Sequence, residues 1–72
     1  MPAMKNLSYD IVTVLQSKLE AVAAYEIYLK DCKESGDTSC QKLVAELKQD
    51  DERHVGLLRA ELERMVREGK FQ

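Results

Sequence analysis

The stretch Glu34-Ser35-Gly36-Asp37-Thr38-Ser39 decides the fold, because it is the only loop-like segment in the interior of the chain. Gly36 suits the left-handed backbone position just beyond the end of a helix. The next residues, Thr38-Ser39-Cys40-Gln41, have the spacing of a capping box at the start of a second helix. One helix is therefore predicted to end at this stretch and another to begin there.

Apolar residues recur every three or four positions on both sides of this turn, with the period of an amphipathic helix. Ser8 suits the N-cap of the first helix, and Gly69 suits the end of the second. We expect a single domain, residues 1–72, with helices at about 8–34 and 39–68 and a turn at about 35–38. The predicted inner stripe comprises Ile11, Leu15, Val22, Tyr25, Leu29 and Cys32, then Cys40, Leu43 or Val44, Leu47, Asp51, His54, Leu58, Leu62 and Met65.

The predicted fold is all-α, an antiparallel helical hairpin. A chain of 72 residues buries little apolar surface against an ordering entropy of about 1.5 kcal/mol per residue. One hairpin leaves its apolar stripe half covered, whereas two hairpins related by a two-fold axis cover both stripes. We therefore expect a homodimer or higher homo-oligomer in which the hairpins form a four-helix bundle.

Composition argues against several classes of partner. The chain is 44% hydrophobic and 33% charged with a net charge of −2, so it has no basic field for nucleic acid or anionic lipid. No apolar run approaches the roughly 18 residues of a membrane span. Residues 1–6 lack the apolar core of a signal peptide, which favours a cytoplasmic location. A phosphate-binding Gly-rich loop and a Ser/His/acid set are also absent.

Polar residues interrupt the inner stripe near its middle. Alternating steps of four and three place Lys18 on the inner face of the first helix, and Asp51 and His54 on that of the second. Lys18 and His54 are each 18 residues from Gly36, so the three side chains should meet at one level. Tyr25, about two turns closer to the loop, is expected to reach toward Asp51 with its hydroxyl. Buried charges without partners are costly, so these groups should satisfy one another.

An acid three residues before a histidine is also a metal-ligand spacing. It places a carboxylate and an imidazole side by side on one helix face, as in di-iron helical bundles. Asp51 and His54 have this spacing. They are therefore the candidate metal ligands of the chain.

At these residues the chain resembles the ferritin-like superfamily, in particular the two-helix half-bundles of encapsulated ferritins and, more distantly, bacterioferritin and rubrerythrin. Residues 19–25, Leu-Glu-Ala-Val-Ala-Ala-Tyr, are similar to the first ligand helix of that family. Residues 50–58, Asp-Asp-Glu-Arg-His-Val-Gly-Leu-Leu, are similar to the segment around its Glu-x-x-His motif. The resemblance implies a ferritin-like four-helix bundle, iron bound by Asp51 and His54 at a dimer interface, Fe(II) oxidation, and an encapsulating shell as a partner.

Two departures from the family pattern leave two functions open. Lys18 stands where the family has a glutamate ligand, and Asp51 is one methylene shorter than glutamate. The first interpretation is a small protein of iron metabolism with an altered ligand set, and the departures leave its ferroxidase activity undecided. The alternative is a metal-free dimerisation module, a scaffold or adaptor, in which Lys18 neutralises Asp51 with His54 and Tyr25 around the pair. An ammonium beside the site would repel a divalent cation.

Two cysteines flank the turn symmetrically. Cys32 and Cys40 are each four residues from Gly36, so they should face one another across the mouth of the hairpin. A disulfide forms there if the geometry and the compartment allow it. In a reducing cytoplasm the alternative is a pair of small buried thiols.

Overall fold

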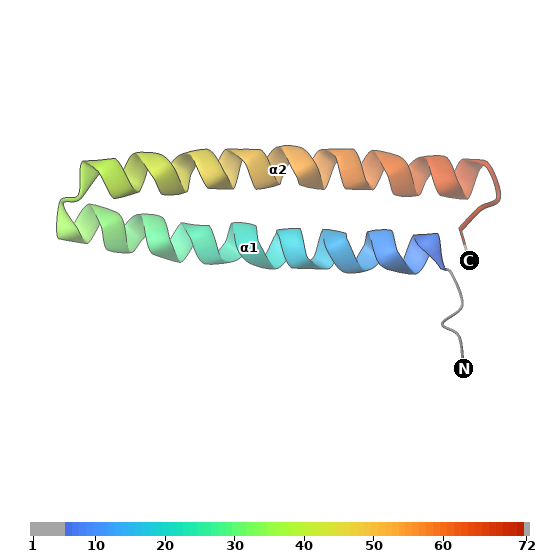
Figure 1. Cartoon of the computed structure of the whole chain (residues 1–72), viewed down its shortest axis with the longest axis horizontal. Coiled ribbons are helices and arrows are strands. Elements are labelled where there is room, and N and C mark those ends of the chain that lie inside the picture. Colours follow the sequence, from blue (N-terminus) through green and yellow to red (C-terminus); the bar gives the residue numbers. More distant parts are fainter. Residues whose placement is uncertain (1–5, 72) are drawn as a thin grey trace.

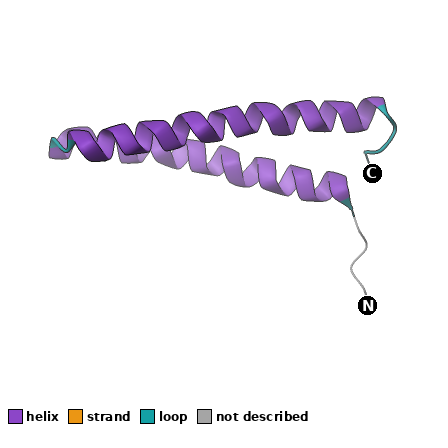
Figure 2. Cartoon of the chain, turned by 45° about the horizontal axis from the view of Figure 1, so that its top comes forward, coloured by secondary structure: helices purple, strands orange, loops and turns teal. Residues whose placement is uncertain are grey.

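The protein is a hairpin of two long helices. The computed structural model describes residues 6–71, so nearly all of the N-terminal stretch that argued against a signal peptide lies outside the described residues. Helix α1 spans Leu7–Ser35 and helix α2 spans Thr38–Arg67. They run antiparallel, so the start of α1 and the end of α2 lie at the same end of the hairpin, opposite the turn (Figure 1). A second view shows that the two axes are inclined to one another (Figure 2). The predicted all-α hairpin is confirmed.

Neither helix, over the part of the chain that the structure describes, is long and apolar enough to cross a membrane. The helix bounds differ from the predicted ones by about one residue at each end. The predicted N-cap of α1 is wrong. Asn6 is the cap, and its Oδ1 accepts a hydrogen bond from the Tyr9 backbone N–H at 2.9 Å. Ser8 lies inside the helix and donates its hydroxyl to the same oxygen at 2.9 Å. Both residue types favour N-caps, so intrinsic preference alone does not distinguish Asn6 from Ser8.

The turn consists of Gly36 and Asp37. Gly36 has a φ of 71°, the left-handed conformation predicted for it, and its N–H donates to the Lys33 carbonyl at 3.1 Å. Asp37 is the N-cap of α2, because its Oδ1 accepts from the Cys40 backbone N–H at 2.9 Å. The predicted capping box beginning at Thr38 is therefore one residue out of place. The negative charge of an aspartate cap also interacts favourably with the positive end of the helix dipole.

Alanine substitutions at Gly36 and Gly56 should change the stability of the protein in opposite directions. A Cβ at either position would meet no atom within 4 Å, so only backbone conformation differs. Gly36→Ala forces alanine into the left-handed region and should destabilise the protein by about 1–2 kcal/mol. Gly56 lies within α2, and Gly56→Ala should stabilise it by about 1 kcal/mol. Urea unfolding of both variants measures the difference, and equal effects would contradict this account of the turn.

Helix α1 covers only part of the predicted inner stripe of α2. The stripe of α1 is turned toward α2 as expected. In α2, the predicted Val44, Asp51, Leu58, Leu62 and Met65 are half-buried or buried, and so are Lys48 and Val55, which were not predicted. Leu47 is 40% exposed, Leu43 is 55% exposed and Cys40 is exposed as well, so a single hairpin leaves these three positions uncovered.

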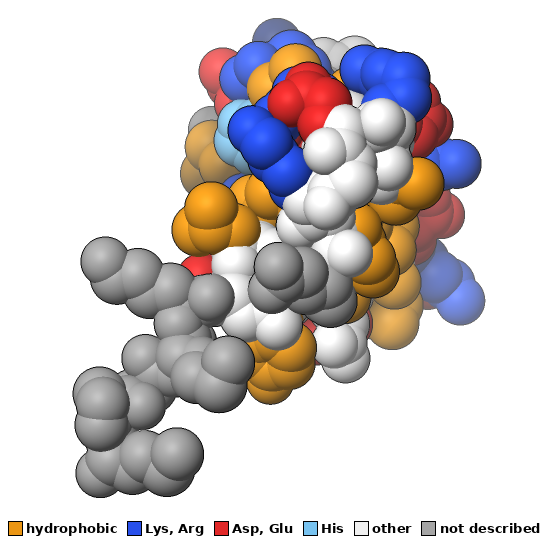
Figure 3. Space-filling view, turned by 90° about the vertical axis from the view of Figure 1, so that its right-hand side faces the viewer, with side chains coloured by type: hydrophobic (Ala, Val, Ile, Leu, Met, Phe, Trp, Pro, Cys, Tyr) orange, Lys and Arg blue, Asp and Glu red, His pale blue; other side chains and the backbone are white. Residues whose placement is uncertain are grey.

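The hairpin has almost no core of its own. Among its described apolar side chains only Cys32, at 7%, and Met65, at 4%, are nearly inaccessible to solvent. Many large apolar side chains remain 40% exposed or more: Leu7, Tyr9, Val12, Val14, Leu19, Ile27, Tyr28, Leu43, Leu47, Leu57, Val66 and Phe71. At the end where the chain termini lie, hydrophobic side chains reach the surface beside charged ones (Figure 3).

Candidate functional site: a polar layer beside an apolar strip

An ion pair joins the two helices near their middle. Lys18 Nζ lies 2.8 Å from Asp51 Oδ1, and the Asp51 side chain is only 11% exposed against 33% for Lys18. Counting outward from the turn predicted this meeting. The hydrogen bond from Lys18 holds the pKa of the Asp51 carboxyl below its usual value, although burial acts in the opposite direction. Asp51 is therefore ionised at neutral pH and its charge is compensated by Lys18.

His54 lies beside this pair and is only loosely engaged with it. Its Nδ1 is 3.4 Å from Asp51 Oδ1, and the imidazole lowers the pKa of that carboxyl less than Lys18 does. Although Nδ1 is buried, no hydrogen bond of good geometry reaches it within residues 6–71. The Arg53 guanidinium, which can only donate, lies 3.2 Å from Nε2. The predicted neighbours Lys18, Asp51 and His54 are thus brought together.

Tyr25 does not join the layer, contrary to the prediction. Its ring packs edge-on against Tyr28 on the same helix, with centroids 6.2 Å apart and planes at 71°. In the described part of the chain its hydroxyl makes no hydrogen bond to Asp51.

Sequence reasoning missed a second cross-helix pair, between Glu26 and Lys48. Lys48 Nζ lies 2.9 Å from Glu26 Oε1, and this contact raises the pKa of Lys48. The signal was present, because Glu26 and Lys48 lie ten and twelve residues from Gly36 and so at nearly one level. Lys48 also has the i,i+4 spacing for a pair with Glu52 on its own helix, so spacing alone does not single out Glu26.

A shallow groove opens beside the polar layer. Its volume is about 270 Å³, and it is lined by Ile11, Val14, Lys18, His54, Leu57, Leu58 and Glu61. Val14 of α1 and Leu57 of α2 both line this groove. Val14 and Tyr28 are fourteen residues apart, as are Leu43 and Leu57, so each pair recurs on one helix face after about four turns.

These residues define a lateral strip along one flank of the hairpin. It consists of Val14, Tyr28, Leu43, Leu47 and Leu57, whose exposed fractions run from 40% to 58%. Toward the terminal end the strip is bounded by charge, because Arg64 contacts Glu61 at 2.7 Å and Glu68 at 3.1 Å.

The residues of one hairpin do not make a metal site. Over residues 6–71, no three His, Cys, Asp or Glu side chains converge in a way that could hold an ion. Asp51 and His54 supply two donors, and the Lys18 ammonium already occupies the Asp51 oxygen that lies closest to His54. A second hairpin would have to complete any ligand set.

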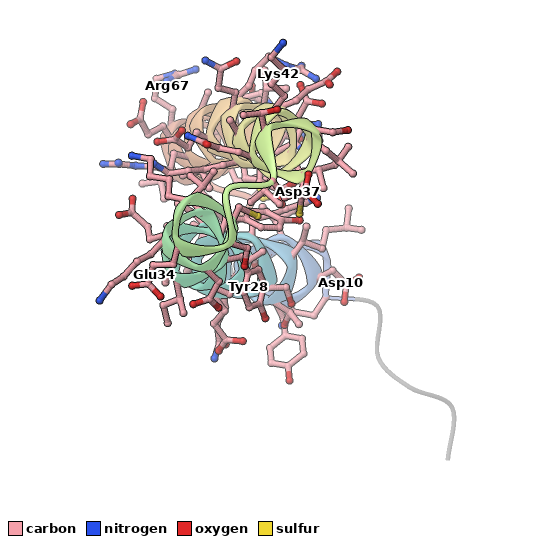
Figure 4. The ribbon with its side chains drawn as sticks, turned by 90° about the vertical axis from the view of Figure 1, so that its left-hand side faces the viewer. Asp10, Tyr28, Glu34, Asp37, Lys42 and Arg67 are labelled. Carbon is pink, nitrogen blue, oxygen red and sulfur yellow. The ribbon has the colours of Figure 1, made fainter. Side chains whose placement is uncertain are left out.

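The two cysteines meet at the turn. Cys32 Sγ and Cys40 Sγ are 2.9 Å apart, and sulfur atoms lie between the helices close to Asp37 (Figure 4). Both are free thiols; Cys32 is buried, but Cys40 is exposed, so the alternative of two buried thiols is wrong for Cys40. The hydrogen bond with Cys40, followed by burial, raises the pKa of Cys32 to about 11.

No protein-family model matches the chain, and neither a curated protein nor a solved structure is detectably similar to it. The resemblance to ferritin-like proteins therefore rests on residues 19–25 and 50–58 alone.

Proposed function

We propose that the chain is a self-association module, in which two hairpins pack their lateral strips together about a two-fold axis to form a four-helix bundle. The observation that carries the proposal is a set of large, exposed apolar side chains on a hairpin that has almost no core. Chains below about 70–80 residues commonly need oligomerisation or covalent staples to be stable. Association would supply the core that one hairpin lacks.

A second copy suits the strip better than an unrelated partner does. The strip carries apolar residues at matching intervals on both helices, so two copies can pack the same surface against itself, as a two-fold interface requires. The chain's net charge is only −2, so repulsion between copies is weak. The opposite flank includes the Glu26–Lys48 pair and is less suited to a dry interface.

The Lys18–Asp51 pair would place one polar group beside this mostly apolar interface. Lys18 lines the groove that the partner would fill and is paired with the less exposed Asp51, so a shifted packing would bury one charge without the other. A buried polar pair of this kind disfavours alternative registers of a helical bundle. The module would then act as a scaffold or adaptor with a defined geometry.

Sedimentation equilibrium of the full chain tests the proposal directly. A dimer should form with increasing concentration, and the thermal midpoint should rise with it because association stabilises only the folded chain. A monomer from about 1 μM to 1 mM, with an unchanging midpoint, would overturn the proposal.

Iron binding is a second candidate, favoured by the 3.4 Å approach of His54 Nδ1 to Asp51 Oδ1. A two-fold dimer would contain two Asp51–His54 pairs. The positive charge of Lys18 would then be the main obstacle to binding a cation there. Lys18→Glu should increase the iron content per chain at least about tenfold over the wild type, because it replaces an ammonium by a ligand. Elemental analysis of chelator-free protein measures this. An equally metal-free Lys18→Glu variant that still dimerises would remove the iron hypothesis and leave self-association standing.

A further inference from the structure

Both cysteines at the turn are held in place through one residue. Asp37 donates its backbone N–H to the Cys32 carbonyl at 3.2 Å, and its carboxylate accepts from the Cys40 N–H at 2.9 Å. Gly36 closes the same turn in its left-handed conformation. The short separation of the two sulfur atoms therefore follows from the capping geometry of both helices and does not depend on flexible side chains alone.

We propose that Cys32 and Cys40 form a redox-active dithiol, which a low-molecular-weight disulfide converts into an intrachain disulfide across the turn. The sulfur atoms are 2.9 Å apart, and a disulfide bond is about 2.05 Å long. Closing it requires a movement of about 1 Å. The product would staple the C-terminal end of α1 to the N-terminal end of α2.

The two thiols have different roles in this exchange. Cys40 is exposed, so its thiolate attacks the small disulfide R–S–S–R, forms a mixed disulfide and releases one R–S⁻. Cys32 then attacks the Cys40 sulfur from within the turn and releases the second R–S⁻. Two protein thiols and one R–S–S–R become one protein disulfide and two R–SH, with the protein protons taken up by the leaving thiolates.

The reduced pair is arranged so that Cys32 reacts second. Its contact with Cys40 keeps the Cys32 thiol protonated in the reduced protein, because that contact is the main reason its pKa is raised. Once Cys40 carries the small thiol, this contact with an ionisable partner is lost. Cys32 is then freer to ionise, and it lies next to the sulfur it attacks.

Oxidised glutathione, added in excess to the reduced full chain, tests the proposal. We expect both thiols to disappear together, no glutathione to remain attached, and a Cys32–Cys40 linked peptide in a non-reducing digest. Because closure is intramolecular, its rate should not depend on protein concentration. The oxidised chain should unfold on the order of 10 °C higher than the reduced chain.

Two matched variants identify the roles. Cys32→Ser should accumulate stable glutathione on Cys40, whereas Cys40→Ser should react at least about tenfold more slowly, because Cys32 is buried. Circular dichroism confirms that both variants are helical. Stable glutathione on the wild-type chain, cysteines linked between two chains, or thiols that persist would each overturn the proposal.

Discussion

A chain in which Leu43 and Leu57 are both replaced by glutamine is expected to be monomeric at concentrations at which the wild-type chain dimerises. The two leucines are 55% and 58% exposed in the hairpin, so their replacement removes little from its own packing. A symmetric dimer would bury four of these leucine side chains, and the burial of each should stabilise the dimer by about 1.5 kcal/mol or more. The dissociation constant should rise by at least about a thousandfold.

The control for this double variant is Ile27→Gln. Ile27 is 62% exposed, comparable to the two leucines, and its heptad position places it on the outer side of α1, away from the lateral strip. Glutamine keeps good helix propensity at all three sites. Sedimentation equilibrium should show that the Ile27→Gln variant still dimerises like the wild type. If both variants dissociate equally, or neither does, the lateral strip is not the interface.

Lys18→Met should lower the thermal midpoint by roughly 5–10 °C at neutral pH and fixed protein concentration. The substitution keeps the length of the side chain and removes the charge that compensates Asp51, which is 8% exposed. The expected loss is moderate because Lys18 is one-third exposed and His54 Nδ1, at 3.4 Å, takes over part of the pairing.

The pH dependence of this loss has a defined sign. In the wild type the folded pKa of Asp51 lies below 3.8, its ordinary value. Its stabilisation is therefore fully present above about 3.8 and is lost as the pH falls through the folded pKa. Without Lys18, burial raises the folded pKa of Asp51, so the charged form is penalised at pH 7 and relieved on acidification. The difference between the thermal midpoints of the wild type and Lys18→Met should therefore become smaller as the pH falls from about 7 to 4.

Lys18→Met/Asp51→Leu is the control for this effect. Replacing both partners by apolar groups removes the unpaired charge, so the double variant should recover most of the stability lost in Lys18→Met. Thermal unfolding followed by circular dichroism at several pH values measures all three chains. A midpoint difference that is the same at every pH would show that lost packing, rather than the charge of Asp51, causes the effect.

The local features of this fold were accessible from the sequence because they depend on spacing along the chain. The 3.5–3.6 periodicity predicted two helices, and Gly36 predicted where the first one ends. Counting from that turn placed Lys18 at the level of His54, with Asp51 one helical turn away, and equal distances predicted that Cys32 meets Cys40. Each of these contacts follows from one straight helix folding back upon another, so arithmetic along the chain suffices.

The tertiary structure decided which part of the α2 stripe is covered and the partners of individual polar groups. An apolar stripe that is wide enough for several neighbours does not specify which part of it faces α1, and in the hairpin Leu47 remains 40% exposed. Asn6 is the cap two residues before the predicted Ser8, and Asp37 is the cap one residue before the predicted Thr38. Intrinsic preference does not resolve shifts this small.

The same distinction applies to the candidate site, between which residues lie close together and which bonds they form. The sequence alone determined that a lysine, an aspartate and a histidine share one level of the hairpin, because heptad counting depends only on helix geometry. Only the packed structure decided that Lys18 bonds Asp51 directly, that Tyr25 turns to Tyr28, and that Lys48 reaches Glu26. Those choices depend on distances of a few ångströms between helices, and long polar side chains can span more than one such arrangement.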